Sequence, residues 1–224
     1  MLPVFVINLD RSADRLARVG AELDRLAVAW ERLPAVDGRA LPAEDRDRNP
    51  PSRWRRPLRP GEMGCFASHR RAWTMVLERG LPAAVVLEDD IRLGPDLPEV
   101  LAAIEATPPA GGFVRLMSIL ETERLPWGPL GRFRLEETVG FSRCSGTQGY
   151  VVTAEAARGL LAGSELWRVP VDNYMDTAWR HGVLDFQVMP PAIACDDDVG
   201  SEIVAMSPEA ALRPRRPLAE RLRR

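Results

Sequence analysis

The sequence predicts an α/β sandwich built around a largely parallel sheet. Short apolar runs that are typical of buried strands alternate along the chain with longer stretches in which apolar residues recur every three or four positions, as in amphipathic helices. The 224 residues, 46% of them hydrophobic, suffice for one large domain with a substantial core. We therefore expect a single domain over residues 1–212 and a basic C-terminal tail over residues 213–224.

The first half of the chain predicts three strands and two helices. The strands are expected at 4–8, at 35–38 before a turn, and at 83–87, where the residues are apolar and rich in valine. Residues 11–30 and 61–78 have apolar side chains at helical spacing, and in the second stretch one face combines Phe66, His69, Trp73 and Val76. The Pro- and Arg-rich residues 45–60 indicate a loop.

The second half predicts further strands and helices in alternation. Strands are expected at 114–117, 148–153 and 186–188, with a weaker strand pair within 132–141. Helices are expected at 154–161 and 171–180, and an acidic turn at 196–198. In a sheet of this kind ligands bind at the carboxyl ends of the strands, so residues directly after the strands are candidates for a site.

Composition excludes several classes of protein. All 30 basic residues are arginine, which excludes a lysine nucleophile or Schiff base. Cys65, Cys144 and Cys195 lie far apart with no C-x-x-C pair, which indicates buried thiols rather than a zinc site or disulfide framework. No apolar run approaches the roughly 20 residues of a membrane span, and the first residues are typical of a strand rather than a signal peptide. We expect a cytoplasmic protein.

Three carboxylates, Glu88, Asp89 and Asp90, follow the strand at 83–87 without a spacer. Carboxylates at a strand end repel one another and resist burial, a cost that a divalent cation would remove. Oxygen ligands suit magnesium and manganese. Because side chains alternate along a strand, Glu88 and Asp90 should face one way and Asp89 the other. A solvated acidic turn is the alternative that the triplet alone leaves open.

The surrounding motifs resemble glycosyltransferase family 25, which includes bacterial lipooligosaccharide galactosyltransferases and animal collagen galactosyltransferases. The resemblance rests on the run G-E-M-G-C-F-A-S-H at 61–69, then Trp73, then L-E-D-D at 87–90. Three other segments are similar to the family in the same order: V-I-N-L-D-R at 6–11, G-T-Q-G-Y at 146–150 and P-V-D at 170–172 with Met175. One position departs from it, since Cys195 stands where the family tends to have glutamine.

The resemblance implies a GT-A-like nucleotide-binding sandwich that transfers a hexose, galactose first among them, from a UDP-sugar to a saccharide acceptor. It implies an acceptor in lipooligosaccharide or another envelope glycan, free or lipid-linked, and a manganese or magnesium cofactor. We expect an inverting transfer. The Arg-rich tail then fits peripheral contact with anionic lipid on the inner face of the cytoplasmic membrane, and no motif for nucleic-acid recognition supports that other use of the arginines.

The same resemblance suggests roles for individual residues. Asp90 is expected to be the principal metal ligand, supported by Glu88, with Asp89 as a second-rank candidate. The donor side would comprise Asn8, Arg11, Arg15, Asp37 and His69, although His69 on an apolar helix face is equally typical of a core histidine. The expected general base is Asp172, with Asp176 in reserve, and a helix cap is the alternative role for Asp172. The acceptor side would comprise Thr147, Gln148 and Tyr150.

Two other functions compete with this one. The first is a catalytically inactive relative that only binds nucleotide or carbohydrate. The second is a sugar-nucleotide pyrophosphorylase, which the absence of glycine from Asn8-Leu9-Asp10-Arg11 disfavours, because such enzymes usually have a Gly-rich loop after the first strand.

Overall fold

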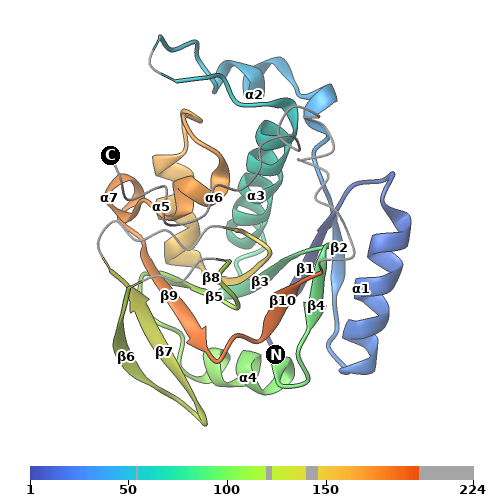
Figure 1. Ribbon diagram of the computed structural model, residues 1–224, viewed down its shortest axis with the longest axis vertical. Helices are drawn as coiled ribbons and strands as arrows, with labels where there is room; N and C mark the ends of the chain where they lie inside the picture. Colours follow the sequence, from blue (N-terminus) through green and yellow to red (C-terminus); the bar gives the residue numbers. More distant parts are fainter. Residues whose placement is uncertain (54, 120–122, 140–145, 197–224) are drawn as a thin grey trace, which may run out of the picture.

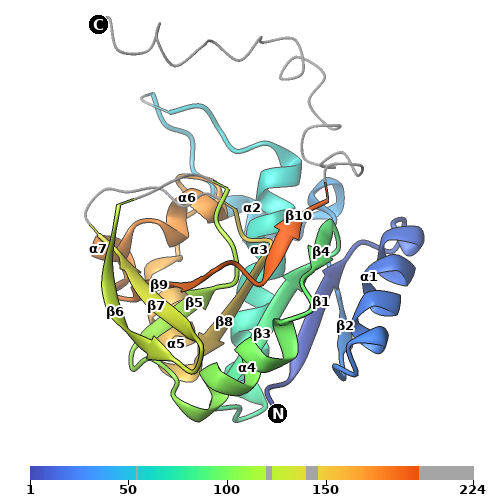
Figure 2. The same cartoon turned by 60° about the horizontal axis from the view of Figure 1, so that its bottom comes forward.

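The computed structural model describes residues 1–53, 55–119, 123–139 and 146–196. Eight strands form one sheet, and helices cover both of its faces (Figure 1). The strands of this sheet are β1 (Val4–Asn8), β2 (Glu31–Pro34), β3 (Ala83–Glu88), β5 (Gly112–Arg115), β6 (Arg124–Leu130), β7 (Phe133–Thr138), β8 (Gly149–Thr153) and β9 (Leu184–Met189). A separate two-stranded sheet pairs β4 (Ile91–Leu93) with β10 (Ile193–Cys195), which lie side by side in Figure 2.

The order of strands in the large sheet is β2-β1-β3-β8-β5-β9-β7-β6. The pairs β1–β2, β1–β3 and β5–β9 are parallel, whereas β8 is antiparallel to both of its neighbours. The β6–β7 hairpin adds one further strand in each direction at the edge, where β7 is antiparallel to β9. Only β7 and β8 therefore run against the other strands of this sheet, which confirms an α/β fold around a largely parallel sheet.

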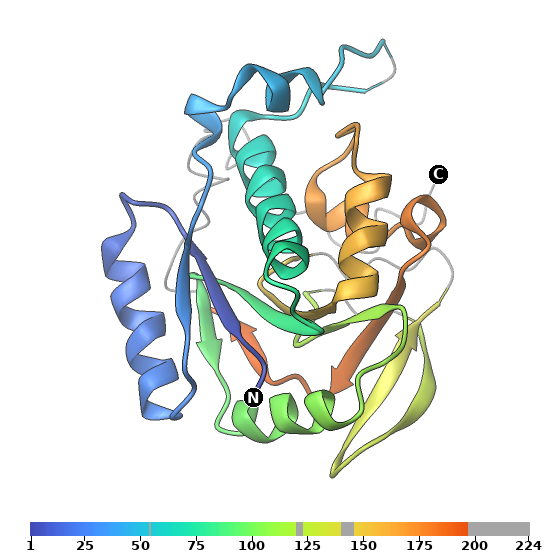
Figure 3. The same ribbon diagram turned by 180° about the vertical axis from the view of Figure 1, so that it is seen from behind.

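Two apolar cores fill the two faces of the sheet. One core packs α1 (Ala13–Arg25), α4 (Leu97–Ala106) and the small sheet against the valine and leucine side chains of β1 and β3. The other packs α3 (Pro60–Glu78), α5 (Ala154–Gly163) and α6 (Val171–Met175) against the opposite face, and Figure 3 shows α3 and α5 side by side there. Successive side chains of β3 point alternately into these cores, so both faces of the strand are buried.

Several expected elements have different bounds. The first helix ends at Arg25, because Ala27 takes a positive φ of 55° and the Val28 N–H bonds back to the Leu23 carbonyl. The strand expected at 35–38 lies at Glu31–Pro34, and the single helix expected at 171–180 is split into α6 and α7 (Ala178–His181). The loop expected at 45–60 begins with the short helix α2 (Ala43–Asp47).

The remaining expectations concern the ends of the chain. The tail at 213–224 and residues 197 and 198 of the acidic turn lie outside the described residues. Within the part of the chain that the structure describes, no helix combines the length and hydropathy that crossing a membrane requires.

Candidate functional site

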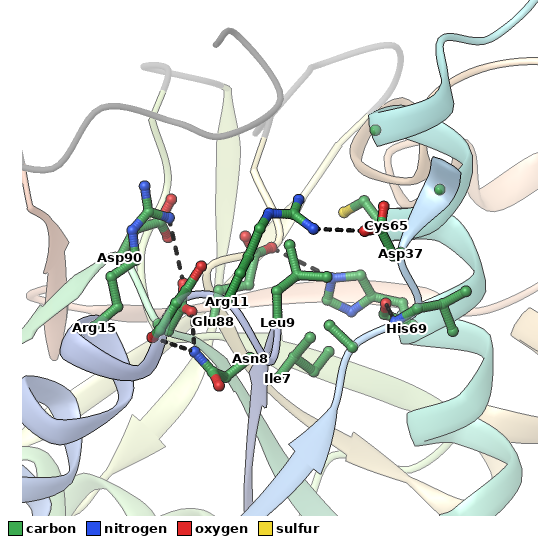
Figure 4. Close-up of a pocket in the computed structure, with 17 residues that line it drawn as sticks. Ile7, Asn8, Leu9, Arg11, Arg15, Asp37, Cys65, His69, Glu88 and Asp90 are labelled. Carbon is green, nitrogen blue, oxygen red and sulfur yellow. Dashed lines mark hydrogen bonds and ion pairs between the residues drawn. The ribbon is translucent and has the colours of Figure 1, made fainter. Parts of the chain in front are cut away.

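A cleft opens where β1 and β3 end, between the first turn of α1, the first half of α3 and the segment that follows β2 (Figure 4). It contains about 670 Å³ of space, part of it open to solvent. Its walls bring together all eight residues that the sequence predicted for the donor and metal sites: Asn8, Arg11, Arg15, Asp37, His69, Glu88, Asp89 and Asp90. A cleft in which several polar and charged groups converge is typical of a small-molecule site.

The G-E-M-G-C-F-A-S-H motif builds one wall of the cleft through its structural residues. Glu62 caps α3 by accepting a hydrogen bond from the Arg59 N–H at 2.8 Å, and Arg56 holds its carboxylate at 2.6 and 2.7 Å. A Cβ at Gly64 would lie 2.6 Å from the Val36 carbonyl oxygen, so only glycine lets residues 36–38 pack this close to the helix. Ser68 accepts a hydrogen bond from the Val36 N–H at 2.9 Å.

Glu88 and Asp89 have partners on opposite sides of the end of β3. Asp89 accepts a hydrogen bond from Asn8 Nδ2 at 2.6 Å and lies 3.5 Å from Arg15 Nη1, on the side of α1. Glu88 faces α3, where His69 Nε2 lies 3.3 Å from its Oε1 and the Thr147 hydroxyl donates to the same oxygen. Asp90 Oδ1 is buried and has no hydrogen-bond partner among the described residues.

The pKa values of the three carboxyl groups follow from these contacts. Burial, then the charges of Glu88 and Asp89, raise the pKa of Asp90 to about 7. Burial also raises the pKa of Asp89, although Asn8 and Arg15 oppose it. For Glu88 the effect of burial is outweighed by its interaction with His69 and, to a smaller extent, by the hydrogen bond of Thr147, and its pKa is lowered. Asp90 is thus the carboxylate whose negative charge the protein itself compensates least.

The residues present fit a hard divalent cation. Asp90 offers a buried carboxylate oxygen without a partner, and Glu88 and Asp89 flank it. Carboxylate oxygens are the ligands that magnesium and manganese prefer. A second cluster lies beside the first, in which donor atoms of Cys65, His69 and Glu88 fall within 4.8 Å of one another. That mixed set of sulfur, nitrogen and oxygen suits softer ions such as zinc.

Basic side chains extend across the mouth of the cleft. Arg11 Nη1 donates to Asp37 Oδ2 at 2.6 Å, linking α1 to the segment after β2, as the dashed line in Figure 4 shows. Asp37 also accepts from the Arg39 N–H at 3.0 Å, and this bond, followed by the charge of Arg11, lowers its pKa. Asn8 is 1% exposed and is held by Arg32 Nε at 3.0 Å as well as by Asp89.

Two of the three residues expected on the acceptor side lie near the acidic cluster. Thr147 bonds Glu88 through its hydroxyl, and the Gln148 carbonyl accepts from the Glu88 N–H at 2.8 Å. Tyr150 does not line an open surface, because it is 1% exposed and its hydroxyl lies between Trp73 Nε1 and His69 Nδ1, 2.9 Å from each. Expecting Tyr150 to contact the acceptor was therefore wrong, since β8 turns this side chain into the core under α3.

The two candidate bases occupy different environments. Asp176 is 9% exposed and pairs with Arg115 Nη2 at 2.9 Å, so its carboxylate serves a buried ion pair and the reserve assignment is not supported. Asp172 lies in the first turn of α6, whose N-cap residue is Pro170, and its Oδ1 accepts from the N–H of the adjacent Asn173. Neither aspartate is among the described residues that line the cleft.

Cys65 is the site residue that sequence reasoning missed. It was interpreted as one of three plain buried thiols, yet it lines the cleft beside His69 and Glu88. Burial, followed by the charges of Glu88 and Asp172, raises the pKa of its thiol well above the usual range. The signal that could have found it was the spacing of Cys65 and His69, four residues apart on one helix face.

Asp196, the last described residue, contacts the backbone of Asp90. It is 3% exposed and pairs with Arg18 and Arg92, both at 3.0 Å, while its N–H bonds the Asp90 carbonyl at 3.0 Å. The first residue of the expected acidic turn is thus a buried anchor for the segment that contains Asp90. Cys195, just before it, pairs with Ile91 through the backbone of β10.

Comparison with known proteins identifies relatives of this chain. The bovine (Bos taurus) protein named "Probable inactive glycosyltransferase 25 family member 3" is 34% identical over 77% of this chain and 31% of its own length. Procollagen galactosyltransferase 1 of Danio rerio is 29% identical over 82% of this chain and 32% of its own length, and the human procollagen galactosyltransferase 2 is 28% identical over 82% and 31%. The chain therefore spans about a third of the length of these relatives.

A solved structure, the mannose-1-phosphate geranyltransferase of Thermus thermophilus, aligns over 84% of this chain and 73% of its own. Its TM-score of 0.38 at 10% identity is too low to assign a fold family or an activity. The decisive match is the sequence profile described as Glycosyltransferase family 25 (LPS biosynthesis protein), which covers residues 1–126, more than half of the chain, and includes every residue of the cleft. The chain belongs to glycosyltransferase family 25.

Proposed function

We propose that this chain is a metal-dependent glycosyltransferase that moves a hexose, first of all galactose, from a UDP-sugar to a saccharide acceptor. The observation that carries the proposal is the convergence of Glu88, Asp89 and Asp90 on one cleft, with a buried oxygen of Asp90 left without a partner. The procollagen galactosyltransferases among its relatives support the reaction class. A GT-A-like arrangement of donor and metal follows from the family.

In this proposal Asp90 is the principal ligand of manganese or magnesium, and Glu88 supports it. When bound, the cation acts as a Lewis acid that stabilises the charge developing on the diphosphate leaving group. Arg11 and Arg15, at the mouth of the cleft, would attract the phosphates, and Arg11 would exchange Asp37 for them. Asp37 and Asn8 would border the nucleoside.

The acceptor would approach from the side of Thr147 and Gln148, which contact Glu88. Asp172 would take the proton of the attacking hydroxyl while the donor sugar leaves from the opposite face, an inverting transfer. We further propose an acceptor in lipooligosaccharide or another envelope glycan, free or lipid-linked, and action in the cytoplasm, including the inner face of the cytoplasmic membrane. Nucleic acid has no part in the proposal.

The test is turnover of nucleotide sugars by the purified chain. UDP-galactose and a panel of other nucleotide sugars are incubated with the chain and manganese, with and without EDTA and saccharide acceptors, and released UDP is measured. The proposal expects UDP release that requires the metal, increases with the right acceptor and is lost in Asp90→Asn. UDP release that persists in EDTA would refute the role of the cation.

A second candidate is a binding protein without turnover, since the bovine relative at 34% identity is named as probably inactive. This candidate predicts that UDP raises the thermal midpoint of the chain while no nucleotide sugar is consumed. The complete carboxylate triplet with its partnerless oxygen favours the enzyme.

A further inference from the structure

Four side chains form one hydrogen-bonded series beneath the cleft. Trp73 Nε1 lies 2.9 Å from the Tyr150 hydroxyl, which lies 2.9 Å from His69 Nδ1, and His69 Nε2 lies 3.3 Å from Glu88 Oε1. Trp73 and His69 are 0% exposed and Tyr150 is 1% exposed. The series therefore runs from the core under α3 to the carboxylate at the end of β3, out of reach of bulk water for all but its last member.

The chemistry of the groups fixes the direction of each bond. The indole N–H can only donate, so Trp73 donates to the Tyr150 oxygen. The Tyr150 hydroxyl proton then needs an acceptor, and among the described residues the only one that the hydroxyl contacts is His69 Nδ1. A proton on Nδ1 would leave the buried hydroxyl proton unsatisfied, which costs about 1–3 kcal/mol. The remaining imidazole proton therefore sits on Nε2 and points at Glu88.

We propose that Trp73 and Tyr150 hold His69 as the Nε2–H tautomer, and that His69 is a positioning residue that orients Glu88 for the cation. His69 and Thr147 both donate to Oε1 of Glu88, so Oε2 is the oxygen left for the cleft. The same assignment removes His69 from the Cys65–His69–Glu88 cluster as a metal ligand, because Nε2 has no lone pair to offer.

The position of the proton follows from the structure alone, whereas the consequence for transfer rests on the proposed function. The two parts therefore need separate measurements. Nitrogen-15 NMR of the imidazole rings addresses the first, and it is simple here because the chain contains two histidines. His181 is an internal reference, since its Nδ1 accepts from the Val183 N–H at 3.1 Å. The variant His181→Asn assigns the two sets of signals.

At neutral pH, the inference expects a pyridine-like Nδ1 and a pyrrole-like Nε2 for His69, without and with zinc. In Tyr150→Phe the Nδ1 signal should move toward that of a pyridine-like nitrogen without a hydrogen bond, because the hydroxyl donor is gone. A protonated Nδ1, or an Nε2 signal that zinc converts to a metal-bound one, would overturn the inference. Should Tyr150→Phe fail to fold, the spectra of the unaltered chain decide alone.

Transfer is tested with two substitutions of His69. Glutamine places an amide N–H near the position of Nε2, whereas asparagine reaches only as far as Nδ1. His69→Gln should therefore retain about 10-fold more metal-dependent transfer than His69→Asn, as one hydrogen bond to a charged group predicts. Equal activity of the two variants would refute the positioning role. If the unaltered chain transfers no sugar, the proposed function is refuted. The NMR spectra still decide the tautomer of His69 independently.

Discussion

Asp90 bears a charge that its surroundings oppose. Burial and the neighbouring carboxylates raise its pKa to about 7, and one oxygen has no partner among the described residues. Removing this charge should therefore not destabilise the protein. Asp89 differs from Asp90 in that Asn8 and Arg15 contact its carboxylate. The two adjacent aspartates thus differ in how far neighbouring side chains compensate their charges.

The first prediction follows for Asp90→Asn. Without metal, its thermal midpoint near pH 8 should equal or exceed that of the unaltered chain, while the increase caused by manganese should disappear. Differential scanning fluorimetry with and without manganese measures both. Asp89→Asn is the matched control, in which the increase caused by manganese should persist because Asp90 is still present. An undiminished manganese effect in Asp90→Asn would place the cation elsewhere.

The second prediction concerns Asp172. Pro170 is the N-cap residue of α6 and no side chain caps this helix, so the capping role considered for Asp172 is not found. Asp172→Asn should leave the unfolding free energy nearly unchanged and should lower transfer by about 10²–10⁴-fold, as loss of a general base does. UDP affinity, measured by calorimetry, should stay the same. Full transfer activity in this variant would exclude Asp172 as the base.

The third prediction concerns His181, whose side chain is 8% exposed. Burial lowers its pKa from 6.5 to about 4. Between these two pH values His181 is therefore protonated in the unfolded chain and neutral in the folded chain. His181 therefore costs up to about 3 kcal/mol of stability as the pH falls from 6.5 to 4, and none above. Urea unfolding across this range should show a steeper loss in the unaltered chain than in His181→Asn. If the unfolding free energies of the two chains fall equally with pH, His181 is not the source of the loss.

At the scale of elements, the close contact of α3 with residues 36–38 gives a fourth prediction. Gly64→Ala would force a methyl group against the Val36 carbonyl and should cost about 1–3 kcal/mol, as overpacking does. It should also weaken UDP binding, because the displaced segment contains Asp37. Gly128→Ala is the control, since a Cβ there has nothing within 4 Å. Denaturant unfolding measures the stability of both variants, and calorimetry measures their UDP affinity. Equal stability and equal affinity of the two variants would refute the prediction.

Elements with a strong apolar period were predictable from the sequence. The helix expected at 61–78 is Pro60–Glu78, and the strand expected at 83–87 is Ala83–Glu88. Helix α4 was missed because Pro95 and Pro98 suggest a turn, yet Pro98 lies in the first helical turn, where its missing N–H removes no helical bond. Strand β6 was missed because it contains two prolines and a glycine, which an edge strand with a register shift accommodates.

The candidate site was predictable only in part, for a related reason. The acidic triplet could be placed at a strand end because local sequence defines the strand. The fates of Tyr150 and Asp176 depend on partners far away in the sequence: Trp73 and His69 for the first, and Arg115 for the second. No local sequence pattern contains those pairings. Before the fold is known, a residue that lines the site therefore cannot be told from a buried residue that supports it.

At the scale of the molecule, Arg115 connects three distant segments. It donates to Asp185 of β9 at 3.0 Å, to Asp176 after α6 at 2.9 Å and to the Gly146 carbonyl at 2.7 Å, and it is 2% exposed. The network holds together the segment before β8 and the end of α6, the two sides from which the residues proposed to meet the acceptor come. Its integrity should matter to both stability and transfer.

The fifth prediction tests this network. Arg115→Leu should lower the unfolding free energy by about 3–5 kcal/mol, because it leaves two buried carboxylates without their cation. Adding Asp185→Asn should recover part of the loss, so the two substitutions will not be additive in a double-mutant cycle. Strict additivity in urea unfolding would show that Arg115 and Asp185 act independently.

The place of β8 in the sheet has a consequence for how the protein is made. This strand lies between β3 and β5, and both edges of β3 are satisfied only once residues 149–153 have left the ribosome. The Asp90 carbonyl obtains its hydrogen bond later still, because its partner is the N–H of Asp196. A nascent chain that already contains every residue of the cleft therefore exposes an unpaired, valine-rich strand edge, a template for aggregation. The edge of β3 is therefore open to such pairing while residues 91–153 are synthesised and released.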